Sequence, residues 1–459
     1  MLLYFILLSL LTTLATPSPL NSQHILGLEN DAQSGEQTAS GTLRRFTPKT
    51  TADLTHLLST AQLHNLDIWK VHAQYIDIYS PSSSPLPTSL YSIPHTANSI
   101  AIPNLNHLRS SSNWHLTSLA NSTFHAEYHP QSEIDWFMHE IARLHPSVAT
   151  VLKLGRSTEG REIFGLKISA PKMPSKRKIV ILGAQHSREW IATSTALYII
   201  HALVAAKEDP NSLAHLLDAH DFHIIPSPNP DGYAYTWEVD RFWYKNRKPV
   251  ANCTGIDMTR NWDSHWEPTA HPPTPWFHRN STNISTEHDP INPCSSFFPG
   301  FRPLDAPEVH HLAEYITAIN VNTNSGNEGN ADTGIAAFLE LRSYGQMFAR
   351  PYSYTCDRTP EDAELVEAML RTAYAGKKRY GTPLLTGTPC EVMYYASAGN
   401  VLDYIHDEQN VKLAFTAYLR DTGLYGFAMP PAWIRPVGEE TGDMVAALSE
   451  FVAKHHDVG

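Results

Sequence analysis

Two side chains that could hold a metal ion follow a short apolar segment near the middle of the chain. His186 and Glu189 come directly after residues 179–182, an apolar run that predicts a buried strand. An imidazole nitrogen and a carboxylate at this spacing can reach one divalent cation, and zinc favours this mixture of ligands. The spacing alone is a weak signal, because His-x-x-Glu also recurs by chance. The neighbouring segments therefore decide whether a metal site is expected.

Several further segments, in the same order along the chain, resemble the zinc carboxypeptidases of the A/B type. They are residues 121–146, 154–161, 186–191, 229–233, 261–263, 292–295 and 419–427. The resemblance covers nearly all of the chain after residue 121. It implies an α/β fold, with a mostly parallel or mixed central sheet and helices on both faces, preceded by a small α+β pro-domain. The alternation of strand and helix patterns in the sequence favours the same fold class.

The resemblance breaks at the positions where the family carries out its chemistry. The family's third zinc ligand is a His, and Arg342 stands in its place; its general base is a Glu, where this chain has Tyr418. Tyr244 replaces an Arg that stabilises the scissile carbonyl. Thr259 replaces the Asn of a pair that binds the substrate's terminal carboxylate. These changes at one site indicate relaxed or redirected selection on catalysis.

Arg342 and Tyr418 are expected to have the largest effect on the chemistry. A phenol with an ordinary pKa of about 10 stays protonated at neutral pH, so Tyr418 is a poor general base. A guanidinium has no lone pair for a metal, and its positive charge repels one. We therefore expect Arg342 to pair with Glu189 and to fill the place of the ion. The alternative is zinc retained by His186, Glu189 and water.

Part of the family's substrate-recognition set is retained. By resemblance, Arg188 would meet a carbonyl of the substrate, and Arg260 would accept its terminal carboxylate. Both are therefore candidate substrate-binding residues. The alternative role for Arg260 is a salt bridge with a neighbour such as Asp257.

Aromatic side chains are also expected around the pocket. Tyr344 and Phe427 would form its walls, and Tyr394 stands where the family has a mobile Tyr. An extra residue within 396–399 leaves Tyr395 as the alternative for that position. Ordinary core packing is the alternative role of each ring.

The four cysteines fit an oxidising compartment. By resemblance, Cys253 pairs with Cys294, and Cys356 and Cys390 form the second pair among three possible connectivities. Four reduced thiols are the alternative. A metal site built from all four cysteines is disfavoured, because the chain contains no Cys-x-x-Cys.

Secretion is the expected fate of the chain, with a final place outside the cell or in a vacuole. Residues 1–16 read as a signal peptide because a short apolar run is followed by small residues and Pro. Sequons for glycosylation begin at Asn121, Asn252, Asn280 and Asn283, the last two within an expected exposed insertion at residues 265–289. No later apolar run is long enough to span a membrane. The formal charge of −12, without a basic cluster, predicts no nucleic-acid partner.

Three parts are expected along the chain: the signal peptide, a pro-region at 17–120 and a carboxypeptidase-like domain at 121–459. The pro-region would hold a pro-domain at about 42–103 and a connector, whereas residues 20–41 lack a hydrophobic period and are expected to have no fixed structure. Apolar spacing predicts helices at residues 51–61, 190–206 and 444–452, a helix capped by Ser132, and strands at 66–69, 75–79, 179–182, 222–225, 335–341 and 411–419.

The expected function is that of a catalytically inactive carboxypeptidase-like protein. Through residues 233–241 and 351–356, the chain resembles fungal inactive metallocarboxypeptidase-like proteins linked to cell-wall organisation. By this resemblance it would bind a peptide C-terminus or a wall component, with zinc weakly held or lost. One alternative is an active zinc carboxypeptidase in which Glu340 or another acid supplies the base. The other is a structural scaffold whose pocket is closed by Arg342 and Glu189. The oligomeric state is left open.

Overall fold

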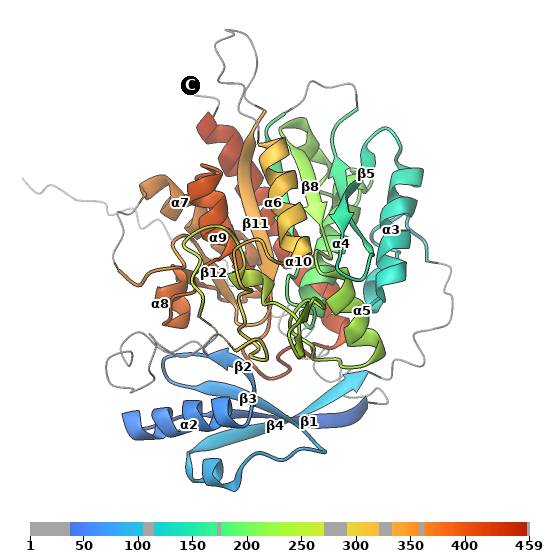
Figure 1. The fold of residues 1–459 in the computed structure, drawn as a ribbon. Coiled ribbons are helices and arrows are strands. Elements are labelled where there is room, and N and C mark those ends of the chain that lie inside the picture. Colours follow the sequence, from blue (N-terminus) through green and yellow to red (C-terminus); the bar gives the residue numbers. More distant parts are fainter. Residues whose placement is uncertain are drawn as a thin grey trace, which may run out of the picture.

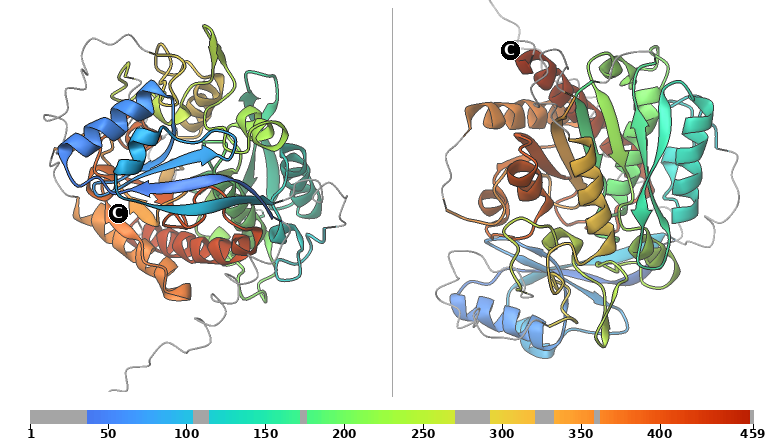
Figure 2. Two further views of the ribbon diagram at one scale, coloured as in Figure 1. Left: turned by 90° about the horizontal axis from the view of Figure 1, so that it is seen from below. Right: turned by 45° about the horizontal axis from the view of Figure 1, so that its top comes forward.

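The chain folds into a small N-terminal unit, residues 37–103, and a larger main unit that starts at residue 114 (Figure 1). The computed structural model describes residues 37–103, 114–171, 176–269, 292–320, 333–357 and 362–456. Viewed from below, the N-terminal unit lies across one end of the main unit (Figure 2). The expected signal peptide, the sequons at Asn280 and Asn283, and most of the expected connector and insertion lie outside the described residues.

An antiparallel sheet and one long helix make up the N-terminal unit. The strand order is β2-β3-β1-β4, so β2 and β4 are the edges. Thr50 and Asp53 form a capping box at the start of α2, and the helix packs on a core that includes Phe46, Leu57 and Ile78. The elements are β1 (Gln37–Phe46), α2 (Thr51–Leu63), β2 (Asp67–Val71), β3 (Ile76–Pro81), the 3₁₀ helix η1 (Thr88–Ser92) and β4 (His95–Pro103).

The predicted elements of this unit are confirmed to within two residues, except at its start. The expectation of no fixed structure through residue 41 is wrong from Gln37 onward. Strand β1 lies between β3 and β4, with Gly41 opposite Pro81 and Gln37 opposite Pro103. Pairing with two distant strands orders a polar segment that shows no hydrophobic period of its own.

A mixed eight-stranded sheet forms the centre of the main unit and confirms the expected fold class. The order is β13-β12-β14-β11-β7-β8-β6-β5, with β14, β11, β7 and β8 parallel to one another. Along β7, Ile179 and Ile181 pack into one core cluster, whereas Val180 and Leu182 pack into another. Both faces of the sheet are therefore buried. The strands are β5 (Ala149–Arg156), β6 (Glu162–Ile168), β7 (Lys178–Leu182), β8 (Asp221–Ile225), β11 (Ile335–Arg342), β12 (Met347–Ala349), β13 (Leu385–Gly387) and β14 (Leu413–Tyr418), with a separate pair, β9 (Pro249–Val250) and β10 (Cys253–Thr254).

Helices cover the two faces of this sheet. Helices α4, α7 and α10 contribute to one core cluster, and α6 contributes to the other. The helices are α3 (Gln131–Leu144), α4 (Trp190–Val204), α5 (Pro230–Glu238), α6 (Pro307–Ile319), α7 (Ala363–Tyr380), α8 (Pro389–Met393), α9 (Val401–Asp403) and α10 (Ile434–His456). Short helical turns are η2 (Phe124–Ala126), η3 (Ala214–Asp218), η4 (Met258–Arg260), η6 (Tyr404–Glu408) and η7 (Pro431–Trp433).

The predicted strands and the helix at 190–206 are confirmed to within two residues, but the start of α3 differs. This helix begins at Gln131 after Pro130, and no side chain caps it. The expected N-cap at Ser132 is therefore wrong, because Ser132 lies in the first turn. Pro130 instead sets the extended backbone that precedes the helix.

Helix α10 begins at Ile434, ahead of the expected start at residue 444. Its first half carries Gly438 and Gly442, which interrupt the apolar period. Gly438 is required by packing, because a Cβ atom there would lie 2.4 Å from the ring of Tyr198 on α4. The close contact between the two helices thus requires a glycine, and this glycine interrupts the apolar spacing by which the helix could be predicted.

Candidate functional site

Three parallel strands end where the altered residues meet. His186 follows β7, Arg342 is the last residue of β11, and Tyr418 is the last residue of β14. Arg342 and Tyr418 are partners in the register of β11 and β14. Because the carboxyl ends of parallel strands lie at one edge of a sheet, the three side chains line one pocket. The prediction that the altered residues share a pocket is confirmed.

The side chain of Arg342 lies between the two candidate metal ligands. Its Nε donates to both carboxylate oxygens of Glu189, at 3.3 and 3.1 Å, and its Nη2 lies 3.1 Å from Oε1. The same Nη2 is 2.5 Å from Nδ1 of His186. The backbone N–H of Ser343 donates to Glu189 at 3.1 Å. The expected pair of Arg342 and Glu189 is present, and the guanidinium also contacts the imidazole.

Contacts on the far side of the ring define the protonation of His186. Its Nε2 lies 2.8 Å from Oδ1 of Asp257 and 3.2 Å from the hydroxyl of Thr259. Since a carboxylate only accepts, we assign the ring proton to Nε2, which donates to Asp257. Nδ1 then accepts a hydrogen bond from Nη2 of Arg342. The same Nη2 also donates to Oε1 of Glu189, which lies 2.9 Å from Nδ1. The imidazole lone pair thus faces a cation, and this cation is the guanidinium.

Burial and neighbouring charges shift the pKa values of the two acids of this network in opposite directions. Glu189 is 1% exposed and Asp257 is fully buried. Burial raises the pKa of Glu189, but the charge of Arg342 outweighs it and leaves the pKa below its usual value. For Asp257, His186 and then Arg260 outweigh burial, and the pKa falls to about 2. Both acids are therefore ionised and paired at neutral pH.

Asp257 is the common partner of the other two altered residues, Tyr244 and Thr259, and of the retained Arg260. The ring of Tyr244 packs against His186 at a tilt of 30°, with centroids 3.7 Å apart, and its hydroxyl donates to Asp257 at 3.3 Å. Thr259 donates to Asp257 through its N–H at 3.1 Å and its hydroxyl at 2.9 Å. Nε of Arg260 lies 3.4 Å from the same carboxylate. The alternative role of Arg260, a salt bridge with Asp257, is the one the structure shows.

The residue at the base position is a poor proton acceptor. Burial raises the pKa of Tyr418 well above its ordinary value, and the guanidinium carbon of Arg342 lies 5.4 Å from its ring centroid. Glu340, the alternative base, accepts from Gln185 at 2.6 Å and from Thr416 at 2.9 Å, and burial raises its pKa. Glu340 is not among the described residues that line the pocket. Its two hydrogen bonds give it a structural role.

Strand β2 of the N-terminal unit lies over the pocket. Residues 68–71 line it together with main-unit side chains. Arg188, 2% exposed, donates through Nη1 to Asp67 at 2.8 Å. The remaining cavity has a volume of about 90 Å³, small beside the roughly 300–1,000 Å³ of typical ligand pockets. The candidate recognition residue Arg188 is thus already engaged within the chain.

The aromatic walls are present, with one correction. Tyr344 and Phe427 line the pocket, as expected. Tyr395 also lines it, whereas Tyr394 does not and instead packs edge-on against His72 of the N-terminal unit, with ring centroids 4.9 Å apart. Tyr394 ends α8 with a φ of 69°, and this turn directs the following residue into the pocket. The choice of Tyr394 is corrected to Tyr395.

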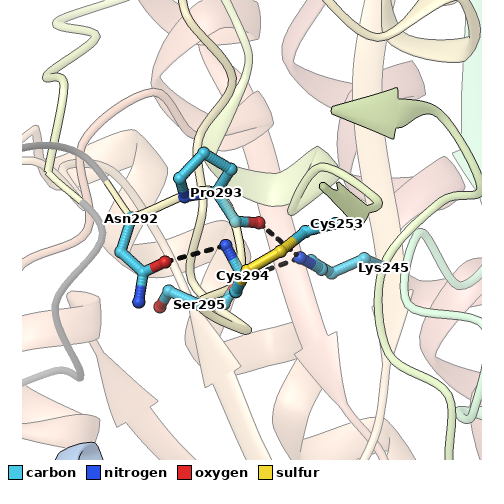
Figure 3. The surroundings of a disulfide bond; sticks show 6 residues. All are labelled: Lys245, Cys253, Asn292, Pro293, Cys294 and Ser295. Carbon is cyan, nitrogen blue, oxygen red and sulfur yellow. Dashed lines mark hydrogen bonds between the residues drawn. A yellow bond between two sulfur atoms is a disulfide. The ribbon is translucent and has the colours of Figure 1, made fainter. Parts of the chain in front are cut away.

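Two disulfide bonds confirm the implied pairing. Cys253 is joined to Cys294 and Cys356 to Cys390, with Cα atoms 5.2 and 5.3 Å apart. Around the first bridge, Lys245 donates to the carbonyls of Pro293 and Ser295 at 3.2 and 2.9 Å (Figure 3). The bridge and these bonds anchor the segment that immediately follows Tyr244.

Two observations bear on the expected location of the chain. Asn121 and Asn252, the described sequon residues, are exposed, so both are open to glycosylation. Within the described ranges, no helix is long and apolar enough to cross a membrane. Glycosylation and secretion remain predictions.

Sequence reasoning missed three acids: Asp257 in the site, and Asp67 and Asp77, which bond Arg188 and Tyr344 across the junction with the N-terminal unit. Asp257 was considered only as a partner of Arg260, although its position two residues before Thr259 was a signal that it belongs to the site. Asp67 and Asp77 lie in strand patterns of the N-terminal unit, and Asp77 stands between two apolar residues that are both buried. An acid inside a buried strand needs a partner, which was the available clue.

The family of the chain follows from comparison with known proteins. The profile of the Peptidase_M14 family, the zinc carboxypeptidases, matches residues 134–444. The chain therefore belongs to the zinc carboxypeptidase family.

Its relatives include proteins described as inactive. A metallocarboxypeptidase A-like protein of Trichophyton verrucosum is 36% identical over 333 residues, which cover 72% of this chain and 71% of that protein. The inactive metallocarboxypeptidase ECM14 of Uncinocarpus reesii is 27% identical and covers 95% of this chain and 78% of its own length. The crystal structure of thrombin activatable fibrinolysis inhibitor matches with a TM-score of 0.73 and 25% identity, over 90% of this chain and 99% of that one.

Family membership implies zinc, but the residues at this site do not fit the ion. His186 and Glu189 remain from the ligand set, and the guanidinium of Arg342 contacts both. Asp257 meets the imidazole on its opposite nitrogen. Over the part of the chain that the structure describes, no three His, Cys, Asp or Glu side chains are grouped to hold a metal. An incoming ion would have to displace the charge that neutralises Glu189.

Proposed function

We propose that the chain is a catalytically inactive member of the zinc carboxypeptidase family that acts through binding or assembly. One observation carries this proposal: Arg342 contacts both Glu189 and His186 and places a fixed cation where hydrolysis needs a Lewis acid. The raised pKa of Tyr418, caused by burial, adds support, because the attacking water needs a proton acceptor. The names of similar proteins, among them inactive metallocarboxypeptidase ECM14, support the same reading.

We further propose that the protein is secreted, outside the cell or to a vacuole, and takes part in cell-wall organisation. The apolar N-terminus at residues 1–16 and the two disulfide bonds support secretion. The link to the wall rests on the resemblance to fungal proteins alone.

The geometry favours a pocket that is closed by the protein's own residues over a pocket that binds the C-terminus of a peptide. Arg260 lines the pocket, which favours a peptide C-terminus as the second candidate. However, Arg260 lies 3.4 Å from Asp257, and Arg188 donates to Asp67. A peptide carboxylate would have to break both contacts while β2 covers the entrance.

A hydrolysis assay with a panel of peptides that differ in their C-terminal residue tests the proposal. The protein is assayed as purified, after addition of zinc, and after treatment with a chelator. We expect background release of amino acids in all three conditions, with an active zinc carboxypeptidase as the positive control. Release by the untreated protein that the chelator abolishes would contradict the proposal and support the active alternative.

A further inference from the structure

The contacts between the two units resemble those inside one domain. Trp69 of β2, 6% exposed, packs against Phe242 and Phe427 of the main unit, with ring centroids 4.8 and 5.0 Å away. It stacks on Tyr79 of its own unit at 4.8 Å. One buried apolar cluster draws members from both units, namely Leu43, Trp69, Tyr79 and Ile100 with Phe242, Tyr344, Phe427 and Ala428. Separation of the units would expose both halves of this cluster to water.

A buried carboxylate holds the units together beside this cluster. Asp77 of β3 is fully buried and accepts from Nε and Nη2 of Arg45, each at 2.7 Å. It also accepts from the hydroxyl of Tyr344, in the main unit, at 2.8 Å. Arg45 donates further to the carbonyl of Thr422 in the main unit at 2.6 Å. Loss of the N-terminal unit would leave the buried hydroxyl of Tyr344 without this partner.

The main unit also uses Arg188 to hold the N-terminal unit. Its guanidinium donates to Asp67 at 2.8 Å and lies over the rings of Phe427 and Tyr244, at 4.3 and 4.6 Å from their centroids. Asp67 is itself fixed by the indole N–H of Trp69 at 2.7 Å. A residue suited to bind an external peptide is thus bound to the chain's own β2.

We propose that residues 37–103 are a permanent part of the working protein and stay bound to the main unit after the chain is cut between them. The inference rests on the proposed function, because a pocket without hydrolysis has no need to open. The partner that the pocket accepts is then β2 of the same molecule, through Trp69 and Asp67. The Arg45–Asp77 pair of β1 and β3 adds contacts to Thr422 and Tyr344 beside it. Any external ligand of the protein binds elsewhere or first displaces this strand.

Cleavage of the full-length protein tests the proposal. A protease recognition sequence replaces residues within 104–113, the protein is cut, and gel filtration is run at micromolar and at low nanomolar concentration. We expect both pieces to elute together at each concentration, and their dissociation to begin only in denaturant. Separate elution at micromolar concentration in native buffer would overturn the proposal.

Two neighbouring arginines of β1 supply a matched pair of variants. Arg45→Ala removes the bond to Thr422, which crosses between the units, together with the contacts to Asp77 and Tyr75 inside the N-terminal unit. Arg44→Ala removes only contacts inside the N-terminal unit, with Ser80 and Tyr91. We expect the first variant to raise the dissociation constant of the cut pieces at least tenfold and the second to leave it nearly unchanged. Equal effects would overturn the role of the Arg45–Asp77 pair. Tyr344→Phe, a conservative change on the main unit, should also weaken retention, and an unchanged dissociation constant would count against that contact.

Peptide hydrolysis by the cut protein distinguishes this inference from the proposed function. Separation of the pieces without hydrolysis would overturn the inference and leave the proposed inactivity intact. Hydrolysis by a cut protein whose pieces stay together would contradict the inactivity and leave the retention intact.

Discussion

At Arg342 a guanidinium meets one carboxylate and one imidazole, and each partner is held from behind by the backbone or by another acid. A divalent ion about 4 Å from this guanidinium would be repelled by about 8 kcal/mol at an effective dielectric constant of about 20. Such a penalty competes with the binding free energy of a catalytic metal. The charge of residue 342 therefore decides whether the site accepts zinc.

Arg342→His should restore zinc binding. The substitution removes the repelling charge and adds a third ligand beside His186 and Glu189. We expect close to one zinc per chain in this variant and far less than one in the wild type, measured by elemental analysis after purification without chelator. Arg342→Lys is the control, because it keeps the positive charge and should remain without zinc. Stoichiometric zinc in the wild type would contradict the argument.

Glu189→Gln should destabilise the fold strongly, because it leaves the buried charge of Arg342 without its main partner. Removal of one member of a buried ion pair typically costs about 3–5 kcal/mol. Urea unfolding measures the loss. Glu367→Gln on α7 removes a partner of Arg371 in an exposed ion pair and should change the unfolding free energy little. Equal effects of the two substitutions would show that the buried pair carries no special weight.

Among the elements, the close crossing of α10 and α4 depends on a single glycine. A Cβ at Gly438 would lie 2.4 Å from the Tyr198 ring, whereas the nearest atom to a Cβ at Gly442 is 3.7 Å away. The two glycines lie one turn apart on the same helix, so they differ mainly in the space around them.

Gly438→Ala should destabilise the protein, and Gly442→Ala should stabilise it. Overpacking at the first position costs roughly 1–3 kcal/mol, and better helix propensity at the second gains about 0.5–1 kcal/mol. Thermal or urea unfolding of the two variants checks the opposite signs. A gain in stability from Gly438→Ala would mean that the helices can shift apart without cost.

The elements could be predicted where one segment carries its own pattern. Strands β7 and β11 are apolar runs, and both were placed to within one residue. No strand was predicted where β1 lies, and the start of α10 was misplaced, because a polar strand is ordered by two distant partners and a helix crossing requires glycine. A local pattern thus predicts the elements that have one, whereas tertiary contacts order the others and set the limits of each element.

At the scale of the whole molecule, buried histidines hold the segment from residue 114 to η2 against the rest of the main unit. Nε2 of His125 lies 3.0 Å from Nδ1 of His201, whose Nε2 lies 3.1 Å from the carbonyl of Leu116. Burial lowers the pKa of His201 to about 4, with the bond to the Leu116 carbonyl and the charge of Asp209 opposing the shift and His145 and Arg435 adding to it. The folded state therefore holds this imidazole neutral.

Stability should fall in mild acid for this reason. As the pH drops below about 6.5 the unfolded chain binds a proton at His201 before the folded protein does, so stability is complete above that pH and is lost toward pH 4. We expect this group to account for about 2 kcal/mol between pH 7.5 and pH 5. The pH dependence of urea unfolding should be shallower by that amount in His201→Gln. The exposed His215→Gln should match the wild type, and an equally steep profile in His201→Gln would refute the assignment.

The sequence alone could indicate which positions of the site had changed, but not how the two units meet there. Arg342, Glu189 and Tyr418 were recognisable because their flanking motifs are intact. The contacts of Asp67 and Asp77 join segments far apart along the chain, and no local spacing encodes them. The same limit applies to Tyr395, whose direction is set by the backbone turn at Tyr394.

The guanidinium at the end of β11 has a consequence for where the protein can persist. A protein whose charge balance depends on a bound ion gains stability with the logarithm of the free concentration of that ion, and this stability is lost when other molecules sequester the ion. Here the balancing charge is a covalent part of the polypeptide and arrives with synthesis. The folded population should therefore be indifferent to zinc starvation and to strong competitors for the metal. Surroundings that would remove zinc from a family member that binds it should leave the fold of this protein unchanged.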